Sequence, residues 1–161
     1  MSPLAFILAD THIPRRARTL TEGLVAYLER AGLILHAGDL ISPSVFEELS
    51  AYNVPVHAVR GNVDMPELDL PETLQLDFGG ARIAMIHDSG RKEGRRKRLG
   101  KRFPEARVIV FGHSHVPFLE DESGLLLLNP GSPTDKRRQP EHTFALLRIE
   151  KGEVRAEILV L

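Results

Sequence analysis

Residues 4–12 read LAFILADTH, an apolar run of six residues that ends in Asp10, Thr11 and His12. A short, uninterrupted apolar run is typical of a strand buried on both faces. The arrangement recurs four times, because further runs rich in Val, Ile, Leu or Phe are each followed by a polar group. These runs are residues 33–35 before Gly38-Asp39, 54–59 before Gly61-Asn62, 82–86 before His87, and 108–111 before Gly112-His113-Ser114-His115.

The polar groups after the five runs include two carboxylates, one amide and four imidazoles. Open α/β sheets bind ligands outside the carboxyl ends of their strands. If the five strands lie side by side, these groups converge on one edge. The chain has no cysteine, so a metal there must take nitrogen and oxygen ligands. The sequence therefore predicts a metal site built from Asp10, His12, Asp39, Asn62, His87, His113 and His115.

This set is large enough for two ions, since a dinuclear centre needs about four donors per ion and a shared bridging group. We expect Asp39 to be the bridging ligand, because Gly38 lets the backbone turn sharply beside the ion. His113 and His115 flank Ser114, and this spacing can give one imidazole to each ion.

The order of elements predicts an α/β (α+β) fold. Helices are expected over residues 19–31 and 42–49, between the first three strands, which indicates parallel crossovers. Hairpin patterns and one further helix dominate the rest of the chain, so we expect it to be mostly antiparallel. The hairpins are expected at residues 73–87, 116–128 and 143–161, and the helix between Gly94 and Phe103. Together these elements predict a sandwich of two sheets covered by helices.

Length and composition favour one domain over residues 1–161, with 42% hydrophobic residues to form its core. The absence of cysteine suits a reducing compartment, so a cytoplasmic location is expected. The apolar stretch at the amino terminus is too short for a membrane span and has no basic residue before it, so neither membrane nor signal peptide is expected.

Residues 91–102 form a basic segment with eight Lys or Arg residues and one acid, Glu93. Two interpretations stay open: a solvated helix face, or a positive field that attracts an anionic substrate. A nucleic-acid backbone is a secondary alternative, because no aromatic residues are interleaved with the charges.

These motifs resemble those of the calcineurin-like metallophosphoesterases, and among them the small bacterial and archaeal phosphodiesterases. Each motif is weak alone, but five in order are specific, and the similarity spans the chain. The five matching motifs are Asp10-Thr11-His12, His36-Ala37-Gly38-Asp39, Gly61-Asn62-Val63-Asp64, His87 and Gly112-His113-Ser114-His115. Asn129-Pro130-Gly131-Ser132 resembles a further signature of the small members.

The resemblance implies a four-layer αββα sandwich of two mixed β-sheets flanked by helices. It implies one ion held by Asp10, His12, Asp39 and His115, and a second held by Asp39, Asn62, His87 and His113. Two divalent ions against two carboxylates would hold a bridging water as hydroxide, which is the expected nucleophile toward phosphorus. We expect Asp39, Asn62 and His113 to serve catalysis as well. Four imidazoles favour transition metals, with Mn expected first and Fe, Zn, Ni or Co as alternatives.

Two positions depart from the family pattern. Many relatives carry a histidine after the motif asparagine, thought to protonate the leaving group, where this chain has Val63. Relatives also place glycine and histidine after the fourth motif, where this chain has Asp88. We therefore expect good leaving groups to be favoured, and Asp88 either to bind a ligand histidine or to lower the positive charge of the site.

The leading functional interpretation is a metal-dependent phosphodiesterase acting on a small anionic phosphoester. The alternatives are a phosphomonoesterase or nucleotide pyrophosphatase on the same centre, or a weakly active or inactive interaction scaffold like the retromer subunit that resembles these enzymes. Homo-oligomer formation stays open. Outside the ligand set, we expect His57 and His142 to be ordinary polar residues, and His36 and residues 129–132 to lie beside the site. Asp64 is expected to orient a ligand or to cap a turn.

Overall fold

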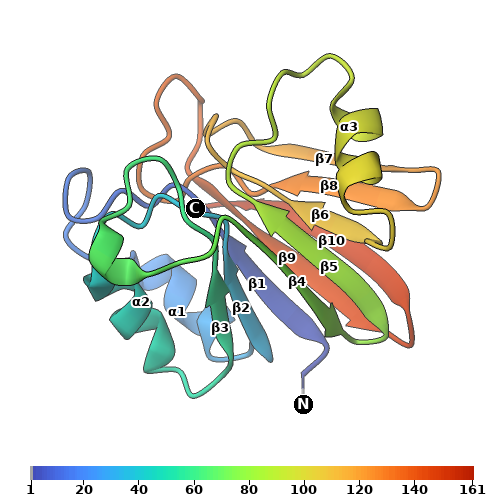
Figure 1. Ribbon diagram of the computed structural model, residues 1–161. Helices are drawn as coiled ribbons and strands as arrows, with labels where there is room; N and C mark the ends of the chain where they lie inside the picture. Colours follow the sequence, from blue (N-terminus) through green and yellow to red (C-terminus); the bar gives the residue numbers. More distant parts are fainter. Residues whose placement is uncertain (1) are drawn as a thin grey trace.

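Two five-stranded sheets form the centre of the computed structural model, which describes residues 2–161 (Figure 1). The first sheet has the order β10-β9-β1-β2-β3 and the second has the order β4-β5-β6-β8-β7. The strands of the first sheet are β1 (Leu4–Leu8), β2 (Leu33–His36), β3 (Val56–Ala58), β9 (Thr143–Glu150) and β10 (Glu153–Val160). Those of the second are β4 (Thr73–Phe78), β5 (Ala81–Ile86), β6 (Val108–Val110), β7 (Phe118–Glu122) and β8 (Leu125–Asn129).

The helices cover the outer faces of the sheets. They are α1 (Glu22–Leu28), α2 (Pro43–Ser50), α3 (Arg95–Arg102) and the short 3₁₀ helix η1 (Pro66–Leu68). Strand β1 is buried on both faces: Phe6 belongs to the cluster with Leu24 of α1 and Leu49 of α2, whereas Ile7 packs in the core between the sheets. On the far side, Leu99 of α3 packs with residues of β5, β6 and β8. The four-layer αββα sandwich is therefore confirmed.

Both sheets are mixed. In the first, β1, β2 and β3 are parallel, and β9 runs antiparallel to β1 and β10. In the second, β5, β6 and β8 are parallel, and β4 and β7 are antiparallel edge strands. The expectation of a mostly antiparallel second half is confirmed by the pairs β4–β5, β7–β8, β9–β10 and β1–β9, and the exception is β6, which lies between two parallel neighbours.

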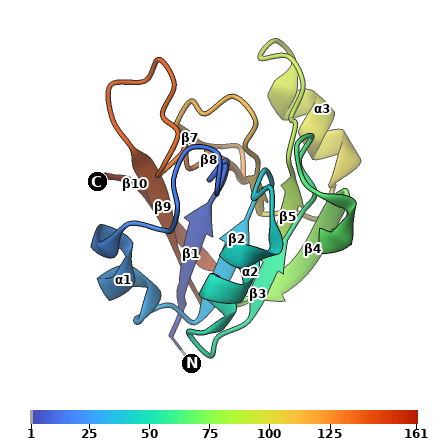
Figure 2. The same cartoon turned by 90° about the vertical axis from the view of Figure 1, so that its left-hand side faces the viewer.

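The five motif-bearing strands do not lie side by side in one sheet. Strands β1, β2 and β3 belong to the first sheet, and β5 and β6 to the second. Their carboxyl ends nevertheless face the same edge of the sandwich, and Figure 2 shows the loops after β1, β2 and β5 at one end of the molecule. Convergence on one edge thus comes from two facing sheets.

Several boundaries differ from the predicted ones. Helix α1 is shorter than residues 19–31, and beyond it the Gly32 N–H already donates to the Leu4 carbonyl at 2.8 Å, which joins the chain to the sheet. The hairpin between β7 and β8 turns at Ser123 and Gly124, both with positive φ, so Asp121 and Glu122 belong to the strand. Within residues 2–161, no helix is long and apolar enough to cross a membrane.

Candidate metal centre

Seven side chains meet where the loops leave the two sheets. Asp10 and His12 follow β1, Asp39 follows β2, Asn62 follows β3, His87 follows β5, and His113 and His115 follow β6. Each contacts at least one other member of the set. The structure therefore brings together every residue of the predicted site.

The backbone at the site is unusual. Asp10, His12, Asp39, His113 and His115 all have positive φ, between +48° and +72°. This left-handed region is sparsely populated by residues with side chains, and such residues cluster at functional sites. Leaving the pleated strand in this conformation turns neighbouring side chains toward a common point.

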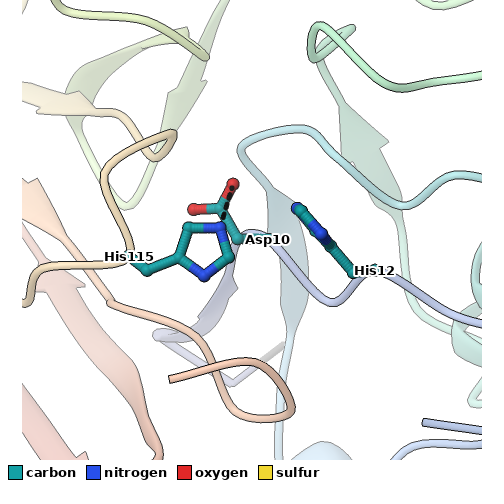
Figure 3. A group of neighbouring side chains, drawn as sticks. All are labelled: Asp10, His12 and His115. Carbon is teal, nitrogen blue, oxygen red and sulfur yellow. Dashed lines mark ion pairs between the residues drawn. The ribbon is translucent and has the colours of Figure 1, made fainter. Parts of the chain in front are cut away.

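A first group consists of Asp10, His12 and His115, whose ligand atoms lie within 4.8 Å of one another. Figure 3 shows the Asp10 carboxylate next to the His115 ring, to which a dashed line joins it, and the His12 ring to the right. His115 Nε2 is 3.7 Å from Asp10 Oδ1. Among residues 2–161, neither oxygen of the buried Asp10 carboxylate has a hydrogen-bond partner, and His115 Nε2 has none either. Burial raises the pKa of Asp10 to about 7. Buried polar atoms without partners are costly, and a cation would satisfy all three.

A second group consists of Asp10, Asp39 and His87, again within 4.8 Å. Asp39 Oδ2 lies 3.3 Å from His87 Nε2 and 3.3 Å from His12 Nε2, so this carboxylate connects the two groups. Burial raises the pKa of Asp39, but hydrogen bonds with His12 and His87 outweigh it and hold the pKa well below its usual range. Asp39 is therefore an ionised acceptor between two imidazoles.

Asn62 and His113 complete the second group on its outer side. Asn62 Oδ1 lies 3.0 Å from His87 Nε2 and 3.1 Å from His113 Nδ1. Both residues are exposed, whereas Asp10, Asp39 and His87 are buried. The centre therefore has a buried half and an open half, and a substrate can approach from the open half.

Hydrogen bonds hold the candidate ligands in place. His87 Nδ1 donates to the Ala37 carbonyl at 2.7 Å, which leaves Nε2 to face the carboxylates. The Asp64 carboxylate accepts the backbone N–H groups of Asp39 and Gly61 at 3.0 and 2.7 Å, so it fixes two motif loops. Outer partners of this kind orient metal ligands. Of the two roles predicted for Asp64, the structure supports the orienting one.

Two glycines of the motifs lie where any larger side chain would clash with a candidate ligand. Gly38 has a φ of +98°, and a Cβ there would lie 2.6 Å from His87 Nδ1. At Gly61 a Cβ would lie 2.0 Å from Asp39 Oδ1. Both glycines thus leave the space in which the candidate ligands meet.

Asp135 is a site residue that the sequence did not reveal. Its Oδ2 lies 3.5 Å from His12 Nδ1, and its backbone carbonyl accepts a short hydrogen bond from His115 Nδ1. Ser132 Oγ accepts the Asp135 N–H at 2.8 Å and donates to the Asp10 carbonyl at 2.7 Å. Residues 129–132 therefore lie beside the site, as expected. Their predicted position is the sequence signal that could have found Asp135, which follows them by three residues.

The two departures from the family pattern lie at the open half. The Val63 N–H donates to Asp39 Oδ1 at 3.0 Å, so its backbone positions the carboxylate although its side chain carries no proton. Asp88 is exposed, its Oδ2 lies 3.9 Å from His113 Nε2, and its Oδ1 accepts the Gly90 N–H at 2.8 Å. Asp88 is thus a neighbour of His113 in the structure.

Three arginines of the basic segment, residues 91–102, are bound to other groups of the protein. Arg96 binds Glu120 and three backbone carbonyls, and Arg98 donates to the carbonyls of Ser89, Arg91 and Glu93. The Arg95 guanidinium lies 4.9 Å from the centre of the Phe111 ring. These three arginines stabilise the fold around α3, so neither a solvated face nor a positive field describes the whole segment.

A hollow of about 380 Å³ adjoins the open half of the centre. It is lined by Asn62, His87 and His113 together with Arg60, Gly61, Glu72, Ile86, Asp88 and Arg102. Its volume is within the range of small-molecule sites. A larger hollow, of about 500 Å³, lies between α1 and the β9–β10 hairpin and contains none of the candidate ligands.

Comparisons with known proteins agree with this geometry. A family model described as the calcineurin-like phosphoesterase superfamily domain matches residues 4–152. A probable metallophosphoesterase from Methanothermobacter thermautotrophicus is 35% identical over 156 residues, which cover 95% of this chain and 90% of the relative.

Two solved structures show the same fold. A Vps29 variant from Entamoeba histolytica has a TM-score of 0.80 at 23% identity and covers 98% of this chain and 99% of its own. A protein described as a novel archaeal phosphodiesterase has a TM-score of 0.75 at 20% identity and covers 97% of this chain and 99% of its own.

Proposed function

The chain belongs to the calcineurin-like phosphoesterase superfamily, and from this we propose that it is a phosphodiesterase with a dinuclear metal centre. The observation that carries the proposal is the buried Asp10 carboxylate from the first sheet. Its two oxygens have no hydrogen-bond partner among residues 2–161, and its Oδ1 lies 3.9 Å from His87 Nε2 and 3.7 Å from His115 Nε2, which both come from the second sheet. Two ions bound there would supply Lewis acidity and an activated water as nucleophile.

The donor set fits divalent transition metals. Carboxylate, amide and imidazole groups surround the centre and no thiolate is available, since the chain has no cysteine. The first ion would take Asp10, His12, Asp39 and His115, and the second would take Asp39, Asn62, His87 and His113. We expect Mn²⁺ first, with Fe, Zn, Ni or Co as alternatives.

The remaining residues position the substrate and the ligands. Asp39 keeps its negative charge between the two groups, since its pKa lies well below the usual range. Asn62 and His113 are the exposed members of the set and would meet the scissile phosphate. The hollow beside them would hold a substituent of that phosphate. We therefore expect a small anionic phosphoester as the substrate.

The test combines metal analysis with hydrolysis. After incubation with Mn²⁺, wild type should hold close to two ions per chain and hydrolyse bis(p-nitrophenyl) phosphate faster than p-nitrophenyl phosphate. Asp39→Asn and His113→Ala should lower kcat/KM by about 100-fold or more, since even outer partners of a metal cost 10- to 100-fold. Asp69→Asn is a matched control, because Asp69 is exposed, outside the site and has a φ that Asn tolerates.

The results also separate the alternatives. A preference for the monoester would favour a phosphomonoesterase on the same centre. Metal binding without hydrolysis of either ester would favour an interaction scaffold, a candidate raised by the likeness to Vps29 and by Val63. Equal rates in wild type, Asp39→Asn and His113→Ala would contradict the proposed centre.

A further inference from the structure

Strand β10 (Glu153–Val160) is the outermost strand of the first sheet, so one of its two edges has no neighbouring strand (Figure 1). We propose that this edge binds a second copy of the same chain, with the two β10 strands antiparallel around a two-fold axis at Ala156. The first sheets of the two copies would then form one continuous sheet. Adding a strand to an exposed sheet edge is a common mode of recognition, and two-fold dimers are the commonest closed assemblies.

Strand β10 lacks most of the features by which edge strands avoid pairing. It has eight residues, whereas the other edge strands, β3, β4 and β7, have three, six and five. It contains neither proline nor glycine, and its register with β9 runs one to one from Glu153 to Val160 without a bulge. Its inward-facing side chains, Val154, Ala156 and Ile158, carry no charge and are only partly buried. An edge of this kind is a template for another strand.

The backbone groups of β10 that face the free edge belong to its even-numbered residues. The Leu161 N–H donates to the His142 carbonyl at 3.0 Å, one step beyond the last pair of the β9–β10 register. Hydrogen-bonded and non-hydrogen-bonded pairs alternate along antiparallel strands. The odd-numbered residues of β10 therefore bond to β9, whereas Val154, Ala156 and Ile158 direct their N–H and C=O groups away from it. Among residues 2–161, none of these three N–H groups has a hydrogen-bond acceptor outside the β9–β10 pair.

Most registers of two β10 strands are excluded by the backbone or by charge. A two-fold axis between two residues would place even-numbered residues opposite odd-numbered ones, so the free N–H groups would not face free carbonyls. An axis at Arg155 or at Glu157 would place that residue opposite its own copy, and like charges directly opposite are destabilising. An axis at Val154 or at Ile158 would shorten the paired segment.

An axis at Ala156 matches both faces of the strand. On the outer face, Arg155 would lie opposite the partner's Glu157, and by symmetry Glu157 would lie opposite the partner's Arg155. On the inner face, Val154 would lie opposite the partner's Ile158, which extends the apolar core. Both kinds of cross-strand pair are stabilising. The even-numbered residues would form the hydrogen-bonded pairs, each of which exchanges two backbone bonds.

Within the chain, neither Arg155 nor Glu157 has an opposite charge directly across from it. Across the hairpin Arg155 lies opposite Arg148, and Glu157 lies opposite Leu146. Arg148, Arg155 and Glu157 are all exposed, and among residues 2–161 their side chains form no ion pair and no hydrogen bond. The partner's Glu157 would bring a negative charge to the two arginines. A second copy of the chain therefore supplies the charge that this edge lacks.

The test measures the oligomeric state of the full chain with charge-reversal variants. Analytical ultracentrifugation of wild type should give a monomer–dimer equilibrium. Arg155→Glu and Glu157→Arg should each raise the dimer Kd about tenfold or more, because both charge pairs of the interface become like-charged. The double variant, Arg155→Glu with Glu157→Arg, restores opposite charges and should return the Kd to within about threefold of wild type. Such a rescue requires residues 155 and 157 to face each other across the two-fold axis.

Two further variants serve as controls. Lys97→Glu changes the net charge as Arg155→Glu does, but Lys97 is an exposed residue of α3, on the outer face of the second sheet, so the Kd should equal that of wild type. Ala156→Pro removes the N–H at the two-fold axis, and because that N–H points away from β9 no bond within the sheet is lost. This variant should be a monomer that still unfolds cooperatively.

Amide hydrogen exchange gives a readout that needs no variant. The N–H groups of Val154, Ala156 and Ile158 should exchange more slowly as the concentration of wild type rises, whereas exchange in α3 should not depend on concentration. A wild type that stays monomeric up to roughly 1 mM would overturn the proposal. So would a dimer whose Kd is unchanged in Arg155→Glu, or a double variant that is folded but stays dissociated.

Discussion

Asp10 and Asp39 belong to one cluster yet have opposite environments. Burial raises the pKa of Asp10, whereas the hydrogen bonds of Asp39 with two imidazoles outweigh the effect of burial. The difference follows from geometry: both oxygens of Asp10 lack hydrogen-bond partners among residues 2–161, and Asp39 Oδ2 lies 3.3 Å from His12 and from His87. A bound cation would therefore stabilise the ionised form of Asp10 more than that of Asp39.

At the same scale, His36 gives a prediction for stability against pH. His36 is fully buried, its Nδ1 accepts the Gly38 N–H at 3.2 Å, and its Nε2 donates to Thr11 Oγ1 at 3.1 Å. Burial, followed by the charge of His87, lowers its pKa from 6.5 to about 3. The unfolded chain therefore takes up a proton below about pH 6.5 while the folded chain does not, and stability falls as pH falls toward 3.

His36→Gln should remove this dependence. Relative to the variant, wild type should lose about 2 kcal/mol of unfolding free energy between pH 7 and pH 5, since each pH unit below the unfolded pKa of about 6.5 corresponds to about 1.4 kcal/mol. Urea unfolding at both pH values in the presence of a chelator measures the difference. Parallel pH profiles of wild type and variant would show that His36 is protonated in the folded protein.

At the scale of elements, α3 holds the loop that carries Asp88. Arg98 donates to the carbonyls of Ser89 and Arg91 at 2.7 Å each and to that of Glu93 at 3.3 Å. One guanidinium thus closes residues 88–94 onto the helix. We expect Arg98→Met to raise the amide exchange rate of this loop and to lower the unfolding free energy by about 1–2 kcal/mol.

Lys97→Met is the control for this change, because Lys97 is the preceding exposed cation of α3 and its side chain makes no hydrogen bond among residues 2–161. Hydrogen exchange of residues 88–94, read by mass spectrometry, makes the comparison. If the amides of residues 88–94 exchange at the same rate in the two variants, the Arg98 contacts do not hold the loop in solution.

The elements also show what the sequence could predict. An apolar run that stops at Asp10 or at His87 is a local signal, so the strand ends and the candidate ligands could be found from it. The end of α1 depends on where Gly32 joins β1, and the bonds of Arg98 depend on the path of a loop. Asp135 reaches His12 from a distant segment. Such contacts are set by tertiary packing, which periodicity and charge patterns do not encode.

At the scale of the whole molecule, the candidate centre joins the two sheets at one edge. Asp10, His12, Asp39 and Asn62 come from loops of the first sheet, and His87, His113 and His115 from loops of the second. The interior between the sheets is otherwise held by aliphatic side chains such as Ile7 and Met85. Ions bound by both sets would therefore add a link between the two sheets at this edge, next to the apolar core.

Metal binding should accordingly raise the melting temperature of the protein. At a free Mn²⁺ concentration 100 times the Kd, one site stabilises the folded state by about 2.7 kcal/mol, which corresponds to a rise in Tm of roughly 5 to 10 °C for a chain of this size. Asp39→Asn should lose most of the shift because Asp39 contacts imidazoles from both sheets, whereas Asp69→Asn should keep it. Thermal unfolding of the three proteins with Mn²⁺ and with a chelator measures the effect. An equal shift in Asp39→Asn and Asp69→Asn would place the stabilising ion elsewhere on the protein.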